Sequence, residues 1–214
     1  MFIIMFNKFL SFNYLMVLLL ALAACKTTSN PEPVVLQATI IRDLAADPTT
    51  IDPATGPRPG TGKFTFFNLR TGLVVPNTDS LTTNWDLGFR GTSIIVNGGT
   101  GRRGNAGVIV RQGLFDEVLE APESGFAQDN PPTGFAIPNT AGNGWYNYDA
   151  PRNLITPIAG RVFIIRTADS RFAKLEILSY YRGAPAVLDA NSASRFFTFR
   201  YVFQADGSRI VSSK

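Results

Sequence analysis

The chain contains no histidine, and this absence excludes more chemistry than any other feature of its 214 residues. Without imidazole there is no Ser-His-Asp or Cys-His nucleophile and no metal site that depends on a histidine ligand. Methionine occurs only as Met1, Met5 and Met16, and the single cysteine, Cys25, has no partner for an intramolecular disulfide. Carboxylates, hydroxyls, amines and guanidinium groups remain. This set suits binding better than catalysis, so we expect no enzyme.

The one cysteine follows an apolar N-terminal stretch that begins near Tyr14. It closes the run Leu-Ala-Ala-Cys at residues 22–25, which resembles the lipobox of bacterial lipoproteins. An apolar segment followed by small residues is typical of a signal segment, and a lipobox implies that the Cys25 thiol is acylated. We therefore predict a signal peptide over residues 1–24 and a lipid anchor in the membrane at Cys25. The alternatives are a plain secretory peptide, or a short membrane span, with an unmodified cysteine.

Residues 25–33 predict a flexible tether, because they are polar and contain two prolines. Residues 34–214 are enough for one domain with its own hydrophobic core. The formal net charge is +4, but the basic residues are scattered, and only Arg102 and Arg103 are adjacent. Nucleic-acid binding needs a basic patch or stripe. We therefore predict no nucleic-acid partner for this exported, anchored chain.

Short segments rich in aromatic and β-branched residues, separated by turn residues, predict strands. The clearest is 195–204, where the aromatic residues recur with the period of two that a strand requires. Residues 161–167 and 171–181 predict a β-hairpin with a short turn. No segment has a sustained helical period. We expect an all-β fold, a single antiparallel β-sandwich-like domain with long irregular loops and at most one short helix. Further strands are expected at 34–44, 63–69, 84–90, 92–97, 108–111 and 209–211, a turn or helix at 114–120, and irregular loops at 47–62 and 121–157.

Two patterns that resemble catalytic motifs have simpler interpretations. The glycine-rich run 98–104 is no phosphate cradle, because an apolar strand pattern and not a helix follows it and no Gly-Lys-Ser/Thr is present. Asp86 with Asp116 or Glu117 has the residue types of a glycosidase pair. Since Asp86 lies beside a tryptophan in a strand pattern, we interpret it as a buried partner for an arginine or a turn amide.

Several segments, in a fixed order, connect the chain to a known family. They are WDLGF at 85–89, IIVNGG at 94–99, FDEV at 115–118 with APES at 121–124, WYNY at 145–148, FIIRTAD at 163–169 with FAKL at 172–175, and FTFRYVFQADGS at 197–208. Together they resemble the HmuY family of haem-binding lipoproteins from Bacteroidetes, over most of residues 63–214. The resemblance implies an all-β fold and a lipid anchor at the outer membrane, facing the periplasm or the cell exterior. It also implies capture of haem for iron acquisition and its transfer to a TonB-dependent receptor.

The chain departs from this family at the ligands of the haem iron. Characterised members use axial histidines, or methionines in some relatives, and no residue after Met16 is of either type. Tyrosine also ligates haem iron. The axial candidates that remain are therefore Tyr146, Tyr148, Tyr180 and Tyr181.

Other candidate ligand-binding residues lie in two further loops. Trp145, with Tyr146 and Tyr148, has the ring chemistry to stack on a porphyrin or a sugar, although such rings also commonly cover a sheet. Arg102 and Arg103 have the charge to pair with haem propionates, the simpler interpretation being a solvated glycine loop. The alternative function is a non-haem structural or interaction lipoprotein of the cell surface or periplasm on the same fold.

Overall fold

The computed structural model describes residues 36–213, and almost every regular element in them is a strand of an antiparallel sheet. The predicted signal peptide, Cys25 and the tether lie outside these residues. A five-stranded and a four-stranded sheet are accompanied by two short two-stranded hairpins. The all-β prediction is therefore confirmed.

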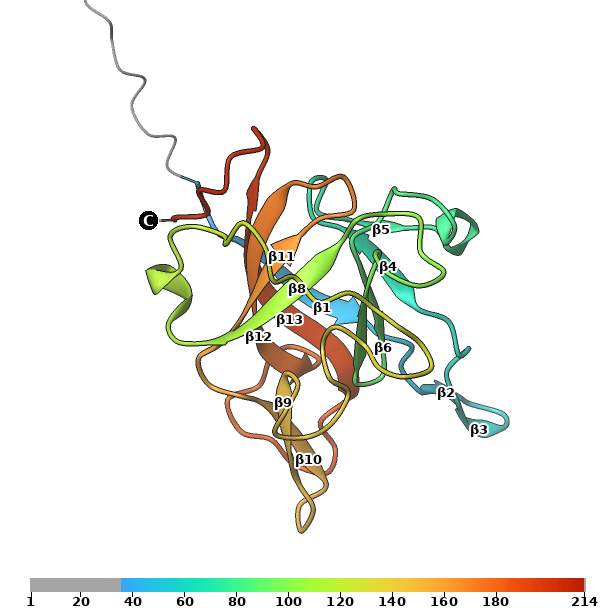
Figure 1. Cartoon of the computed structure of the whole chain (residues 1–214). Coiled ribbons are helices and arrows are strands. Elements are labelled where there is room, and N and C mark those ends of the chain that lie inside the picture. Colours follow the sequence, from blue (N-terminus) through green and yellow to red (C-terminus); the bar gives the residue numbers. More distant parts are fainter. Residues whose placement is uncertain (1–35, 214) are drawn as a thin grey trace, which may run out of the picture. The chain divides into compact units, whose positions relative to one another are not determined.

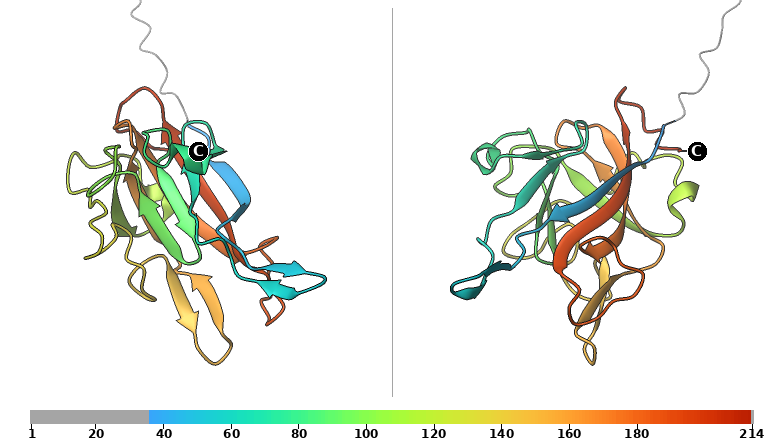
Figure 2. Two further views of the ribbon diagram at one scale, coloured as in Figure 1. Left: turned by 90° about the vertical axis from the view of Figure 1, so that its right-hand side faces the viewer. Right: turned by 180° about the vertical axis from the view of Figure 1, so that it is seen from behind.

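The larger sheet has the strand order β1-β13-β12-β11-β8, with every neighbouring pair antiparallel. The predicted hairpin is present, with Phe163 opposite Leu175 in its two strands. Seen from behind in Figure 2, the long β13 lies beside β1 at the sheet edge. The bounds are β1 (Thr39–Ala45), β8 (Gly107–Gln112), β11 (Arg161–Arg166), β12 (Phe172–Tyr181) and β13 (Ser194–Gln204).

The smaller sheet has the order β5-β4-β6-β7. Two hairpins, β2–β3 and β9–β10, extend from the ends of the sheets (Figure 1). The bounds are β4 (Thr65–Asn68), β5 (Leu73–Val75), β6 (Leu87–Arg90), β7 (Ser93–Val96), β2 (Thr50–Asp52), β3 (Gly56–Arg58), β9 (Tyr146–Asp149) and β10 (Leu154–Pro157).

Three details differ from the sequence prediction. The segments 47–62 and 121–157 are not wholly irregular, because each contains one of these hairpins. No strand forms at 209–211; the segment instead makes an isolated bridge between Ile210 and Glu120. Strand β5 was not expected, because three residues are too few to show a period of two.

Helical structure in residues 36–213 is restricted to two 3-10 turns, η1 (Asn77–Asp79) and η2 (Phe115–Glu117). The second lies within the predicted turn or helix at 114–120. Across the same residues, none of the helical segments has the length and hydropathy to span a bilayer.

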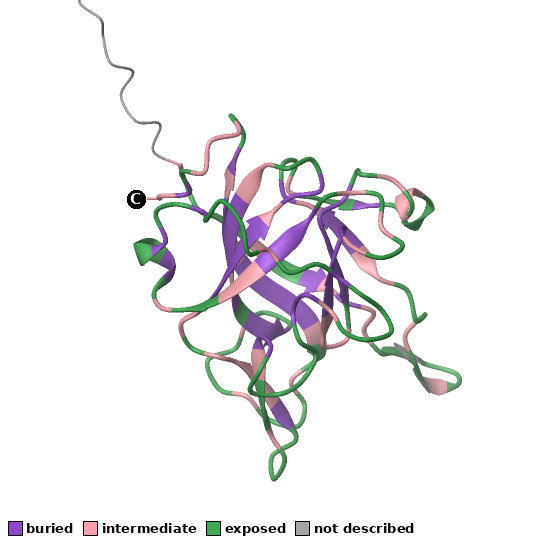
Figure 3. Cartoon of the chain, in the orientation of Figure 1, coloured by how far each residue is buried: buried purple, intermediate pink, exposed green. Residues whose placement is uncertain are grey.

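The core lies between the two sheets, where the buried residues are purple in Figure 3, and it includes many aromatic rings. Phe67 and Phe89 of the smaller sheet contact Phe199 of β13, with ring centroids 5.4 and 5.6 Å apart. Each fully buried ring of this size contributes roughly 1.5–3 kcal/mol to folding. This packing makes the fold a sandwich, as the alternating pattern of 195–204 indicates.

The outer faces of both sheets are also covered. Over the larger sheet, η2 and the C-terminal segment enclose a second apolar cluster that includes Phe115, Val162 and Val202. Over the smaller sheet, Trp85 packs on Phe66 at a centroid distance of 4.3 Å. Apolar clusters therefore pack on both sides of the sandwich.

Candidate functional site

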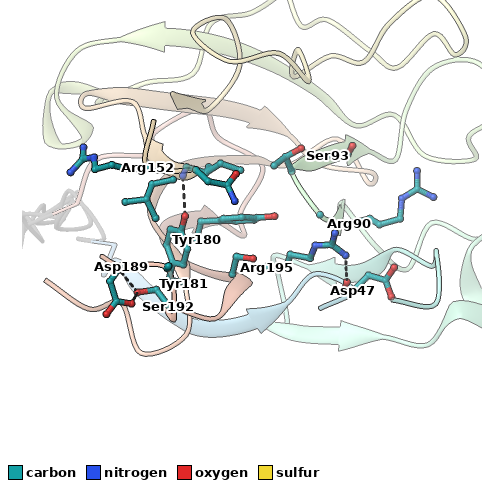
Figure 4. Close-up of a pocket in the computed structure, with 16 residues that line it drawn as sticks. Asp47, Arg90, Ser93, Arg152, Tyr180, Tyr181, Asp189, Ser192 and Arg195 are labelled. Atoms are coloured by element: carbon teal, nitrogen blue, oxygen red, sulfur yellow. Dashed lines mark hydrogen bonds between the residues drawn. The ribbon is translucent and has the colours of Figure 1, made fainter. Parts of the chain in front are cut away.

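A pocket of about 630 Å³ opens at one end of the sandwich (Figure 4). Its walls come from the β6–β7 turn, the end of β12, the start of β13, the loop between those two strands, and β10 with the turn before it. Ligand and cofactor sites in proteins have volumes of roughly 300–1,000 Å³. The pocket therefore has the size of a small-molecule site.

Two consecutive tyrosines, Tyr180 and Tyr181, line this pocket at the end of β12. Neighbours in a regular strand point to opposite faces, so both can share a wall only where the strand is irregular. The register of β12 against β13 shifts between Ser179 and Tyr181. The Ser179 hydroxyl accepts a hydrogen bond from the Tyr181 amide at 3.1 Å, which stabilises the bulge. A local departure from strand geometry thus creates the aromatic wall.

Behind this wall lies a cluster of aromatic rings. The Trp145 ring packs 5.3 Å from Tyr180, 4.9 Å from Phe197 and 4.9 Å from Tyr146. Its indole N–H donates to the Thr92 carbonyl oxygen at 2.8 Å. Because Trp145 is buried and hydrogen-bonded, it supports the pocket wall and does not line the cavity.

The two tyrosine hydroxyls have different surroundings. The Tyr181 hydroxyl accepts a hydrogen bond from the Ile155 amide at 2.9 Å, which connects β12 to the β9–β10 hairpin. Burial raises the pKa of the Tyr180 hydroxyl to about 12, against an opposing charge and hydrogen bond from Arg195. Tyr180 is therefore a neutral phenol at physiological pH.

Three arginines, Arg90, Arg152 and Arg195, and two aspartates carry the charges of the lining. Both acids are already bonded within the chain. The Asp47 carboxylate accepts a hydrogen bond from the Gly62 amide at 2.7 Å. Burial acts to raise the pKa of Asp47, but its hydrogen bonds outweigh burial, and the pKa is lowered. Asp189 accepts from the Asn191 amide at 2.9 Å. The lining thus has one more positive than negative charge.

Comparison with known proteins identifies the fold family. The family model described as HmuY protein matches residues 61–201, well over half of the chain. The chain belongs to the HmuY family. No curated protein matches it significantly in sequence.

Three of the solved structures that the comparison found are from Bacteroides and Tannerella species. A predicted lipoprotein of Bacteroides fragilis is 17% identical, with a TM-score of 0.49, over 81% of this chain and 95% of its own. A predicted HmuY-like haem-binding protein of Bacteroides vulgatus is 14% identical, with a TM-score of 0.44, over 77% and 90%. The apo form of an HmuY analogue of Tannerella forsythia is 14% identical, with a TM-score of 0.42, over 80% and 97%.

Four of the residues proposed from sequence meet in this HmuY-family domain. Tyr180 and Tyr181 line the pocket, and Trp145 and Tyr146 lie in the ring cluster behind it. Tyr148 is about half exposed on β9, and its hydroxyl donates to the Asn153 side chain at 2.9 Å.

Arg102 and Arg103 belong to the β7–β8 connection and do not line the pocket. Arg102 forms an ion pair with the buried Asp129, at 3.7 Å, and lies over the Trp85 ring. The arginines that do line the pocket were not proposed. For Arg195 the sequence offers one weak indication: it is a basic residue at the start of the most regular strand pattern.

The interpretation of Asp86 is confirmed. Its two carboxylate oxygens accept hydrogen bonds from the amides of Leu69 and Ala168, each at 2.8 Å. Burial raises the pKa of Asp86 although both hydrogen bonds act to lower it. In residues 36–213 the acidic side chains form no cluster of three or more that is suited to a metal ion.

Proposed function

We propose that this protein binds a haem-type tetrapyrrole in the pocket beside Tyr180 and Tyr181 and performs no chemistry on it. The observation that carries the proposal is the combination, in one pocket of suitable size, of an aromatic wall with three arginines. A porphyrin has a flat apolar ring and two anionic propionates, which these two features match. Membership of the HmuY family supports the same ligand class.

The residues present fit a tetrapyrrole through its ring and its carboxylates. Tyr180, Tyr181, Leu154 and Ile155 are the aromatic and aliphatic residues of the lining, and Arg195 supplies a cation within the cavity. For the iron, the donors that the lining offers are oxygens, and the tyrosine hydroxyls are the ones with precedent as haem ligands. When bound, haem would bring its iron and its visible absorption to the site; the chain's own part is to hold the ring and its side arms.

We further propose that the chain acts at the outer membrane, anchored through acylated Cys25, and passes its ligand to a TonB-dependent receptor. The lipobox at residues 22–25 and the polar segment after it support this placement. A tethered domain with an open pocket has the properties of a carrier.

Titration of the full chain, purified in mild detergent, with haemin tests the proposal. We expect saturable binding at micromolar concentration or tighter, with a shift of the Soret band. Ala190→Trp, which fills the pocket from an exposed loop position, should weaken binding at least tenfold. The matched control Ala186→Trp lies in the same loop but outside the lining, and should bind like wild type.

Two results would contradict the proposal. One is the absence of saturable binding of haemin and of iron-free protoporphyrin, which would favour the alternative of an interaction lipoprotein on this fold. The other is equal binding by the two tryptophan variants, which would place the ligand elsewhere on the domain.

A further inference from the structure

Arg195 has a backbone conformation that is uncommon for its residue type. Its φ angle is +67°, in the left-handed region, although it lies near the start of β13. Such conformations persist where surrounding structure imposes them, often at functional sites. Here the Arg195 carbonyl oxygen accepts a hydrogen bond from the Ala46 amide at 2.8 Å. In Figure 4 the guanidinium lies between the Tyr180 ring and Asp47.

The charge of Arg195 acts to lower the pKa of the nearby Asp47 carboxylate, but no acid forms an ion pair with it among residues 36–213. Its guanidinium donates to the backbone carbonyl oxygen of Asp47 at 3.0 Å. The Asp47 carboxylate is bound instead to Thr61 and Gly62. A partly buried guanidinium beside a neutral carbonyl retains donors for an incoming anion.

The other two pocket arginines have partners of their own and, unlike the partly buried Arg195, are exposed. Arg152 pairs with Asp149 at 2.7 Å. Arg90 donates to the Gly62 carbonyl oxygen at 2.9 Å, and its guanidinium lies 4.2 Å from the Phe64 ring centroid. Arg195 is thus the pocket arginine best placed to receive a ligand's negative charge.

Tyr180 adds a second donor at the same place. Its hydroxyl lies close enough to Arg195 for the guanidinium charge to act on it, and with a pKa of about 12 it keeps its proton. A guanidinium and a neutral phenol attract a carboxylate, whereas the same cation repels a metal ion.

We infer that Arg195 and Tyr180 form a carboxylate-binding subsite, and that the pocket recognises its tetrapyrrole through a carboxylate side arm and not through the iron. The tetrapyrrole part of this inference rests on the proposed function. The carboxylate part rests on the two side chains alone.

Dissociation constants for three ligands test the inference: haemin, iron-free protoporphyrin IX and its dimethyl ester. We expect protoporphyrin to bind within threefold of haemin, and the ester, whose carboxylates are blocked, to bind at least tenfold more weakly. Arg195→Gln should weaken protoporphyrin binding about tenfold and leave ester binding unchanged. Tyr180→Phe should weaken protoporphyrin binding by a smaller factor, and Arg103→Gln, an exposed residue outside the lining, should have no effect.

The inference is overturned if haemin binds tenfold or more tightly than protoporphyrin, or if the ester binds as well as the free acid. If no tetrapyrrole binds, the proposed function fails, and the subsite is then tested with 2-naphthoate against its methyl ester. A saturable shift of the Arg195 side-chain NMR signal with the acid alone would support the subsite. No shift, or the same shift with both probes, would contradict it.

Discussion

Tyr180 shows at the scale of one residue how burial changes the chemistry that a side chain offers. Its hydroxyl has ordinary phenol chemistry in the unfolded chain, with a pKa of 10.0, and burial raises the pKa to about 12 in the fold. The folded chain therefore keeps a proton that the unfolded chain loses between these two pH values. The contribution of this pKa difference to the free energy of unfolding is fully present below pH 10 and is lost as the pH rises toward 12.

This shift predicts a difference between wild type and Tyr180→Phe at alkaline pH. The wild type should lose up to about 2–3 kcal/mol of unfolding free energy between pH 10 and 12 relative to the variant, because two pKa units correspond to roughly that energy. Urea unfolding of both proteins at several pH values measures the effect. Tyr148→Phe, which removes an exposed hydroxyl, controls for the loss of a tyrosine in general. A constant difference between wild type and Tyr180→Phe across the range would show that Tyr180 is not shielded.

At the scale of elements, η2 is attached to the larger sheet by one buried lysine. Lys174 of β12 donates from its Nζ to the carbonyl oxygens of Phe115 and Val118, at 2.9 and 3.0 Å. The same ammonium lies 4.4 Å from the centroid of the Phe115 ring. Burial lowers the pKa of Lys174, so these contacts offset a desolvation cost.

Lys174→Met should release this attachment. The two carbonyl oxygens would lose their donor, at a cost of about 1–3 kcal/mol in unfolding free energy. Hydrogen exchange should be faster at the amide of Val118, which caps η2, and at the amide of Val211, which donates to the Leu119 carbonyl oxygen just after it. The exposed Lys63→Met should change stability by less than about 0.5 kcal/mol. Unchanged protection around η2 in Lys174→Met would argue against this role.

How well an element could be predicted depended on how its residues divide between two faces. Strand β13 was predictable because its aromatic residues alternate, and one set faces the other sheet. The β9–β10 hairpin was missed because its partly exposed strands combine Asn, Asp and Pro with Tyr and Ile. Such a hairpin is held by its pairing and by the Tyr181 hydroxyl, and neither leaves a periodic signal.

The candidate site could be predicted only in part. The tyrosines and Trp145 were proposed because their rings suit a flat ligand. That they lie together at one pocket could not be predicted, because it depends on pairing between strands far apart in sequence. Arg195 was missed because its importance comes from a backbone angle and from the Asp47 carbonyl oxygen beside it. Arg102 and Arg103 were proposed because their charge suits haem propionates, whereas the structure pairs Arg102 with Asp129.

At the scale of the whole molecule, our proposal is that acylated Cys25 anchors this domain in a membrane. Mass spectrometry of the protein from the membrane fraction of a bacterium that processes lipoproteins should show an acylated N-terminal Cys25. Cys25→Ser should lose the lipid and leave the membrane fraction, since a single thiol carries the modification. Recovery of an unmodified, full-length chain from the cytosol would refute the anchor and the export that it implies.

Our central claim is that the ligand binds at the end of the sandwich beside Tyr180 and Tyr181. Amide NMR of the isotopically labelled full chain in detergent, with and without protoporphyrin IX, tests it most directly. We predict shifts concentrated at Thr92, Ile155 and Ser192, which line the pocket. Shifts centred on residues 98–107, where Arg102 and Arg103 lie, or no saturable shifts at all, would contradict it.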